Sequence, residues 1–189
     1  VDERLTEFEK EAGIELGKIK LSVLIESVRG LHNIETLLGC SKRIDTVTLG
    51  NEDFLHDLGI PPSDTGEEVI VYHVKVIYYA RLFSVMPLGM VGSIADYRNL
   101  DRFRMQAQKS KQLGYMGSSC IHPDQIPILN DVFTPSIAEV ERAKKIVEVF
   151  EQAVRAGRGS CSLDGKMIDP PVYQRALYTL ERYRRMQRR

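Results

Sequence analysis

The stretch VLIESVRG, from Val23 to Gly30, carries a run of branched apolar residues that ends on a carboxylate, Glu26. A run of this composition predicts a buried β-strand. A second stretch, IDTVTLGNEDF from Ile44 to Phe54, repeats the arrangement and places Asp53 just past another predicted strand. Two acids that each follow the end of a strand suggest a common site, if the two strands are neighbours in one sheet.

Extended and helical patterns alternate along the first 135 residues, which predicts four βα units. Strands are expected at Lys20 to Ile25, at Ile44 to Leu49, more weakly at Ser84 to Met86, and at Met116 to Ile121. Such alternation implies a parallel sheet with right-handed crossovers, either doubly wound or part of a β/α barrel.

Helical spacing accounts for the segments between the predicted strands. A first helix is expected over Asp2 to Glu11 with Leu5 and Phe8 inward, and another over Leu100 to Leu113. Thr65, followed three residues later by Glu68, predicts a capping box. The helix that it would open has a broad apolar face made by Val69, Tyr72, Val76, Tyr79, Ala80 and Phe83.

The pattern changes after residue 135. Ser136 and Glu139 predict a capping box for a long helix that ends at about Ala156. A glycine-rich turn and the segment DGKMIDPP lead to a last helix from about Pro171. We therefore divide the chain into residues 1–135, which form the βα units, and residues 136–189, a helical appendage.

Composition and charge exclude several classes of protein. Lys plus Arg and Asp plus Glu both number 26, so no net charge favours nucleic acid or an anionic membrane, and the basic ending RYRRMQRR is expected to be a solvated, fraying helix end. The chain has no apolar run of about 20 residues that would cross a bilayer. Its three cysteines, Cys40, Cys120 and Cys161, lack metal-binding spacing, which fits a reducing cytoplasm.

In parallel α/β folds, ligands lie at the carboxyl ends of the strands, where Glu26 and Asp53 are expected. Mg²⁺ typically takes one or two protein carboxylates and keeps several waters, so this pair suits it. A structural role is equally open: Glu26 would cap the following helix and pair with Arg29, and Asp53 would cap the next helix. The four histidines show no ligand spacing, and no catalytic role is assigned to His32, His56, His73 or His122.

Five motifs together carry a family resemblance. In order along the chain they are IESVRGLHN, LGNEDF, LGYMGSSCIHPDQI, VFTPS and GRGSCSLDGKMIDPPV. In order and spacing they resemble the C-terminal two thirds of the citrate lyase β-subunit and malyl-CoA or citramalyl-CoA lyase group, within the HpcH/HpaI aldolase superfamily. The resemblance implies a TIM-type β/α barrel, of which this chain would form about the second half, plus a C-terminal helical lid.

The same resemblance implies a site. Glu26 and Asp53 would bind Mg²⁺, with Mn²⁺ as an alternative, and Glu26, Asn51 and Glu52 would contact the substrate. Asp169 would be the catalytic acid, on a lid that reaches the active site of a neighbouring subunit in a homo-oligomer of the trimer or hexamer-of-trimers type. From the residues alone, Asp169 could instead cap the last helix. Ser118 stands where members of the family commonly have lysine.

The implied activity is Mg²⁺-dependent cleavage of a 3-hydroxyacyl thioester, of the citryl, malyl or citramalyl type, into an acyl thioester and a 2-oxo acid. Alternatives are a lyase-like subunit that acts only in a complex with an acyl-carrier partner, and a catalytically silent homologue. Half a barrel would have open strand edges. We therefore expect these 189 residues not to be an autonomous monomer, which light scattering can check.

Overall fold

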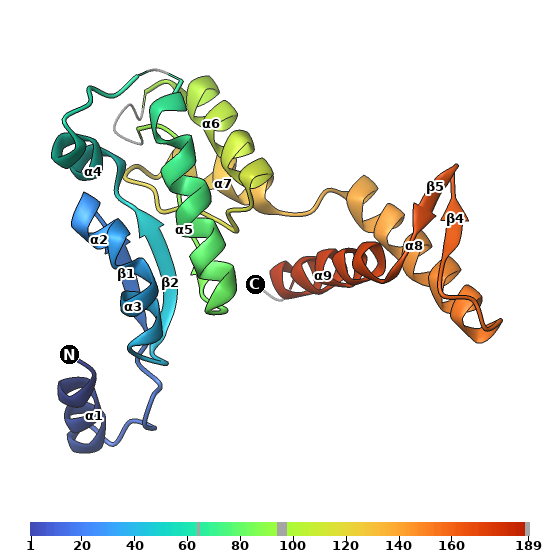
Figure 1. Ribbon diagram of the computed structural model, residues 1–189, viewed down its shortest axis with the longest axis horizontal. Coiled ribbons are helices and arrows are strands. Elements are labelled where there is room, and N and C mark those ends of the chain that lie inside the picture. Colours follow the sequence, from blue (N-terminus) through green and yellow to red (C-terminus); the bar gives the residue numbers. More distant parts are fainter. Residues whose placement is uncertain (64, 94–97, 188–189) are drawn as a thin grey trace. The chain divides into compact units, whose positions relative to one another are not determined.

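The computed structural model describes residues 1–63, 65–93 and 98–187. The chain forms two compact units, Val1–Phe133 and Thr134–Arg189 (Figure 1). The elements of the first unit, in chain order, are α1 Asp2–Glu11, β1 Leu21–Ile25, α2 Val28–His32, α3 Ile34–Gly39, β2 Ile44–Leu49, α4 Asn51–Leu58, the 3₁₀ helix η1 Glu67–Val69, α5 Ile70–Leu82, β3 Met86–Pro87, α6 Leu100–Leu113 and α7 Gln125–Phe133.

The first unit is built on a parallel sheet in the order β1-β2-β3, which confirms the predicted parallel arrangement. Val47, in the middle of β2, is fully buried, and the sheet packs against α5 through Val76 and Ala80. Among the described residues β1 pairs with β2 alone, and the strands do not close into a barrel. The outer edge of β1 is therefore open in the described chain, and the expected self-association stays a prediction.

The third strand begins later than its sequence suggested. Ser84 has a left-handed backbone with φ of 57°, and Val85 donates its N–H to the carbonyl of Ala80 at 2.8 Å. Both features belong to the end of α5, so the chain becomes extended only at Met86. The strand is confirmed, but it covers Met86–Pro87 rather than residues 84–86.

The predicted fourth strand, residues 116–121, is wrong: this described segment is not a regular strand. Met116 donates its N–H to Pro87 at 3.0 Å, but Gly89 donates to the carbonyl of Gly117 at 2.9 Å. A parallel ladder would use the carbonyl of Met116 for that second bond. The second bond is thus shifted by one residue, so no ladder forms and the segment runs beside β3 without joining the sheet.

The capping box predicted from Thr65 and Glu68 is also wrong. The Glu68 carboxylate accepts hydrogen bonds from the N–H of Ser63, at 2.7 Å, and from its hydroxyl. Gly66 precedes the 3₁₀ helix with a left-handed backbone. The Glu68 side chain, which would close the box, is therefore bonded to Ser63, and α5 begins at Ile70.

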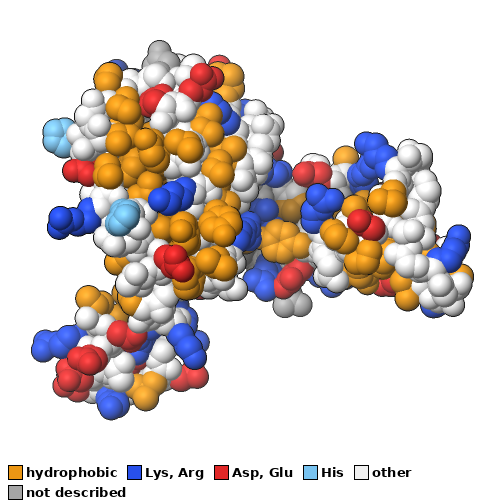
Figure 2. Space-filling view, viewed as in Figure 1, with side chains coloured by type: hydrophobic (Ala, Val, Ile, Leu, Met, Phe, Trp, Pro, Cys, Tyr) orange, Lys and Arg blue, Asp and Glu red, His pale blue; other side chains and the backbone are white. Residues whose placement is uncertain are grey.

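Helix α5 is apolar around most of its circumference. The residues of the predicted apolar face are buried or half-buried, whereas an opposite row of side chains is exposed. Figure 2 shows apolar side chains gathered over this helix. The exposed row consists of Val71, Val74, Tyr78 and Leu82.

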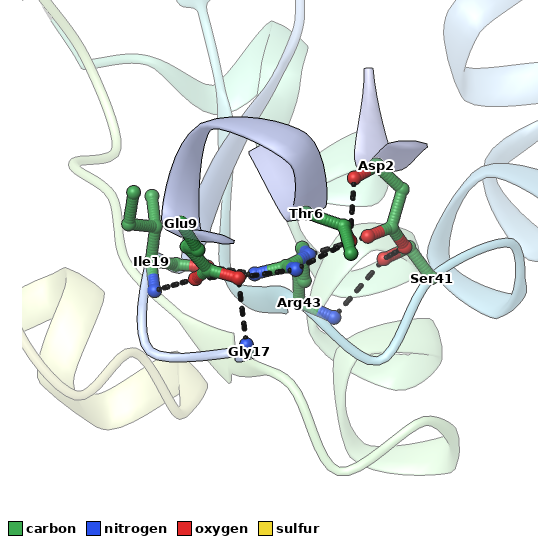
Figure 3. Close-up of polar contacts among 7 residues, drawn as sticks. All are labelled: Asp2, Thr6, Glu9, Gly17, Ile19, Ser41 and Arg43. Atoms are coloured by element: carbon green, nitrogen blue, oxygen red, sulfur yellow. Dashed lines mark hydrogen bonds and ion pairs between the residues drawn. The ribbon is translucent and has the colours of Figure 1, made fainter. Parts of the chain in front are cut away.

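Helix α1 is held to the sheet by a buried ion pair, and not by Phe8, which is 54% exposed in contrast to the prediction. Arg43, just before β2, donates two hydrogen bonds to the Glu9 carboxylate, at 2.8 and 2.7 Å (Figure 3). The N–H groups of Gly17 and Ile19 also donate to Glu9, both at 2.8 Å. Arg43 further contacts Asp2 and Thr6 (Figure 3). The buried carboxylate of Glu9 and the buried guanidinium of Arg43 thus each have several hydrogen-bond partners.

Acid is expected to destabilise the first unit through Glu9. The hydrogen bonds from Arg43 lower the pKa of Glu9 from 4.5 to about 2. A carboxyl with a lowered folded-state pKa contributes stability that is complete above its unfolded pKa and is lost as the pH falls through the folded one. Urea unfolding should therefore show stability declining from pH 4.5 towards pH 2. Glu9→Gln should be less stable at neutral pH and lack that part of the decline, whereas Glu11→Gln should match the wild type.

The second unit pairs two long helices with a short hairpin. Its elements are α8 Ile137–Arg155, β4 Cys161–Leu163, β5 Lys166–Ile168 and α9 Pro170–Met186. The capping box of Ser136 and Glu139 is confirmed, but the antiparallel hairpin was not predicted. Phe150 stacks on Tyr173 at 4.8 Å between ring centroids, and Ile168 of the hairpin is buried with them.

Among the residues described, no helix is long and apolar enough to cross a membrane. The last two arginines of the RYRRMQRR ending lie outside the described residues.

Candidate active site

The parallel register brings the two acidic strand ends together. Ile25 and Leu49, the last residues of β1 and β2, are partners in the ladder. Gly50 then donates its N–H to the carbonyl of Ile25 at 2.9 Å. Glu26 therefore leaves the sheet at the same level as Gly50, and the first turn of α4, which carries Asp53, begins one residue later.

Gly50 makes room for the side chain of Glu26. A Cβ atom at position 50 would lie 2.6 Å from Cγ and 3.1 Å from Oε1 of Glu26. Real Cβ contacts are not that short, so any other residue would displace the carboxylate. The absence of a side chain at Gly50 lets Glu26 lie across the end of β2.

Neither carboxylate has the structural task that the sequence left open. Helix α2 is capped by Ser27, whose Oγ accepts from the N–H of Gly30 at 3.1 Å, and not by Glu26. The cap of α4 is Gly50, with no side-chain hydrogen bond, so Asp53 does not cap that helix. Within the described chain no ion pair joins Glu26 to Arg29. Both acids are exposed and available to a ligand.

A pocket of about 220 Å³ lies at these strand ends. It brings together four of the predicted site residues, Glu26, Asn51, Glu52 and Asp53, and it includes Ser118. The Ser118 hydroxyl donates to the carbonyl of Ser119 at 2.9 Å, so this wall carries a small polar group. The other lining residues are Leu24, Thr48, Leu49, Gly50, Gly89, Met90, Gly92, Ser93 and Ser119.

The donor atoms of this pocket suit a hard cation. Glu26, Glu52 and Asp53 supply carboxylate oxygens, and the N-terminal turn of α4 is where acids are favoured by the helix dipole. Among the described residues no three His, Cys, Asp or Glu side chains lie close enough to enclose a metal ion. Mg²⁺ does not require such a cage, since it commonly uses one or two carboxylates together with waters and substrate oxygens. The residues therefore fit Mg²⁺ held on one side.

The wall formed by residues 89–93 was missed as part of the site by sequence reasoning. Gly89 faces the ring of Tyr115, because a Cβ at position 89 would lie 2.8 Å from that ring. The Tyr115 hydroxyl is 2.6 Å from Nδ1 of His73, and both side chains are buried. Burial lowers the pKa of His73 to about 4, so the ring is neutral near pH 7. His73 is thus a core histidine that contacts Tyr115, and the Tyr115 ring in turn packs against Gly89 of the wall.

Asp169 belongs to the second unit, where it is the N-cap of α9. Its Oδ1 accepts from the N–H of Val172 at 3.2 Å. The capping role that the sequence left open is therefore present. Only Oδ1 of the carboxylate forms the cap, and the Asp169 side chain is half-buried.

Sequence comparison identifies the family. The family model described as HpcH/HpaI aldolase/citrate lyase matches residues 1–123. The chain belongs to this family. The resemblance drawn from the five motifs is thereby confirmed, and the matched residues include both acidic strand ends.

Relatives within the citrate lyase family agree with this assignment. The chain is 37% identical over 182 residues to citrate lyase subunit beta of Haemophilus influenzae, covering 96% of this chain and 62% of that protein. It is 30% identical over 169 residues to L-malyl-CoA/beta-methylmalyl-CoA lyase of Rhodobacter capsulatus, covering 80% of this chain and 52% of that protein. The chain thus spans between about half and two thirds of the length of these relatives.

Solved structures show the shared fold. A citrate lyase from Burkholderia xenovorans matches with a TM-score of 0.81 at 19% identity, covering 98% of this chain and 59% of that one. CitE from Mycobacterium tuberculosis, solved in complex with magnesium, acetoacetate and coenzyme A, matches with a TM-score of 0.72 at 20% identity, covering 95% and 73%. The α/β fold of this chain therefore corresponds to part of the citrate lyase TIM-barrel fold.

Proposed function

We propose that the protein contributes the metal-binding part of a carbon–carbon lyase that cleaves a 3-hydroxyacyl thioester. The observation that carries the proposal is the pair of carboxylates, Glu26 and Asp53, which follow the ends of two adjacent strands, line one pocket and cap no helix. Membership of the citrate lyase family supports this chemistry over other uses of two acids. Citryl, malyl and citramalyl thioesters are the candidate substrates.

The cleavage has a simple proton balance. The bond between C2 and C3 of the thioester breaks, the C3 hydroxyl passes its proton to water and becomes the oxo group of a 2-oxo acid, and C2 gains a proton. A bound Mg²⁺ would supply Lewis-acid stabilisation to the oxygen at C3. Glu26 and Asp53 would hold the ion, and Glu26 and Glu52 would face the substrate. Asp169 would deliver the proton to C2 as a general acid.

Asp169 is proposed to act from a lid. It lies between the hairpin strand β5 and helix α9, in a unit separate from the one that carries the metal ligands. We further propose that the lid serves a neighbouring subunit of a homo-oligomer. Closure of such a segment excludes water from the reacting atoms, which strengthens every charge interaction in the site.

An activity assay tests the proposal. The protein as its gene encodes it is expected to release a 2-oxo acid from malyl-CoA, citramalyl-CoA or a citryl thioester. The release should require Mg²⁺ or Mn²⁺, and it should stop when EDTA removes the ion and resume on its return. Turnover that survives complete metal removal would contradict the role proposed for Glu26 and Asp53.

A second candidate is a subunit that uses a thioester carried by a partner protein. It is favoured by the similarity to a relative named as a citrate lyase subunit. In that case, free CoA thioesters would be poor substrates, and addition of the acyl-carrier protein loaded with the same acyl group would restore turnover. Inactivity with both kinds of carrier would indicate a catalytically silent homologue.

A further inference from the structure

Asn51 ties the end of β2 to the loop that follows β3. Its side-chain Nδ2 donates to the carbonyl oxygens of Met90 and Gly92, both at 2.7 Å. Both N–H bonds of the amide are thereby used. The reversed orientation would place Oδ1 against two carbonyl oxygens, so the hydrogen bonds themselves determine which amide atom faces the loop.

The remaining polar atom of Asn51 is poorly placed to bind substrate. Its Oδ1 is buried and has no hydrogen-bond partner among the described residues. A ligand could reach this atom only if the surrounding chain moved. The amide therefore offers neither a free donor nor an exposed acceptor, although Asn51 lines the pocket.

The loop that Asn51 holds is confined on its other side as well. The N–H of Val91 donates to Oγ of Ser110 at 2.8 Å, and Val91 is fully buried. Gly92 has a left-handed backbone with φ of +96°, and a Cβ there would lie 2.3 Å from Nε2 of Gln106. The same loop supplies four residues of the pocket wall, Gly89, Met90, Gly92 and Ser93.

We propose that Asn51 is a positioning residue, which fixes the position of the loop wall of the pocket relative to the carboxyl end of β2. It stands two residues before Asp53 in the first turn of α4. Its two hydrogen bonds therefore tie the first turn of α4 to the loop that supplies the pocket wall. The kinetic consequence rests on the proposed function, whereas the structural consequence does not.

Hydrogen exchange on the protein as its gene encodes it tests the structural consequence. Asn51→Ala removes both hydrogen bonds, and Asn51→Asp keeps the shape but replaces the donor with an acceptor. Both variants should speed exchange of the buried Val91 N–H, which donates to Ser110, by about 10-fold or more, the scale of losing two hydrogen bonds. Asn33→Ala is the matched control, because Asn33 Nδ2 donates to the carbonyl of Arg29 at 2.9 Å outside the pocket. Unchanged exchange in both Asn51 variants would overturn the proposal.

Kinetics separates positioning from direct binding. Asn51→Ala should raise the KM for the thioester by about 10-fold, with faster loop exchange and unchanged Mg²⁺ affinity in calorimetry. A raised KM with unchanged loop exchange would show direct substrate contact instead. Faster exchange with unchanged KM and kcat would reduce Asn51 to a structural residue. If the wild type turns over no thioester, the proposed function fails, and the exchange experiment still decides whether Asn51 holds the loop.

Discussion

Asp53→Asn is expected to weaken Mg²⁺ or Mn²⁺ binding by more than about 100-fold, since changes to groups that merely support metal ligands already cost 10- to 100-fold. The substitution removes the charge and keeps the shape. Asp53 caps no helix, so folding should be preserved. Isothermal titration should find one site per complete barrel in the wild type. Turnover should fall together with metal occupancy.

Two further variants make the metal experiment decisive. Glu26→Gln should weaken binding in the same way, because Glu26 lines the same pocket from the neighbouring strand end. Asp45→Asn is the matched control: it changes an exposed carboxylate on β2 that does not line the pocket. Unchanged metal affinity in both Glu26→Gln and Asp53→Asn would refute the proposed site.

Asp169→Asn is expected to lower turnover by about 100-fold or more while metal binding stays intact, the usual scale for loss of a general acid. Asparagine is as good an N-cap as aspartate, so the hydrogen bond to Val172 and the stability of α9 should survive. Asp169→Ala should lose both turnover and stability, because alanine cannot cap. Comparing the two variants separates the proton donor from the helix cap.

Asp164 offers a matched control for this substitution. It lies in the turn between β4 and β5 with φ of 51°, a left-handed conformation that asparagine also tolerates. Asp164→Asn should therefore turn over normally. Equal turnover of Asp169→Asn and the wild type would leave Asp169 as a cap only.

Mixed oligomers test whether the lid acts between subunits. An Asp169→Asn subunit retains its metal ligands, and an Asp53→Asn subunit retains its Asp169. If each site uses the lid of a neighbour, mixing the two inactive variants should restore part of the turnover. No recovery in oligomers shown by mass spectrometry to be mixed would indicate a lid that acts within its own subunit.

The sequence was a reliable guide where one element decides its own structure. The strands ending at Ile25 and Leu49 were predictable, since branched apolar runs have few other places in a fold. The Ser136–Glu139 capping box was predictable because both partners lie within one turn. The acids at the strand ends were predictable as neighbours once the sheet was taken as parallel, since parallel strands end at the same edge.

The Thr65 capping box failed because a residue just outside the motif binds the same carboxylate. Thr65 and Glu68 have the spacing of a capping box, but the Glu68 carboxylate accepts its hydrogen bonds from Ser63 instead. The hairpin of the second unit was missed because its strands, Cys161–Leu163 and Lys166–Ile168, are too short for a period to be read.

By itself, the sequence determined the family, the parallel sheet and the identity of the acids that follow its strands. The tertiary structure decided what those acids are free to do. Ser27 and Gly50 take the helix caps, so the carboxylates of Glu26 and Asp53 remain available to a ligand. The tertiary structure also decided that both side-chain N–H groups of Asn51 donate to the loop after β3. The physical reason is that hydrogen-bonding capacity is limited. Ser27 caps α2 from the position next to Glu26, whereas the carbonyl groups that Asn51 binds lie 39 and 41 residues further along the chain.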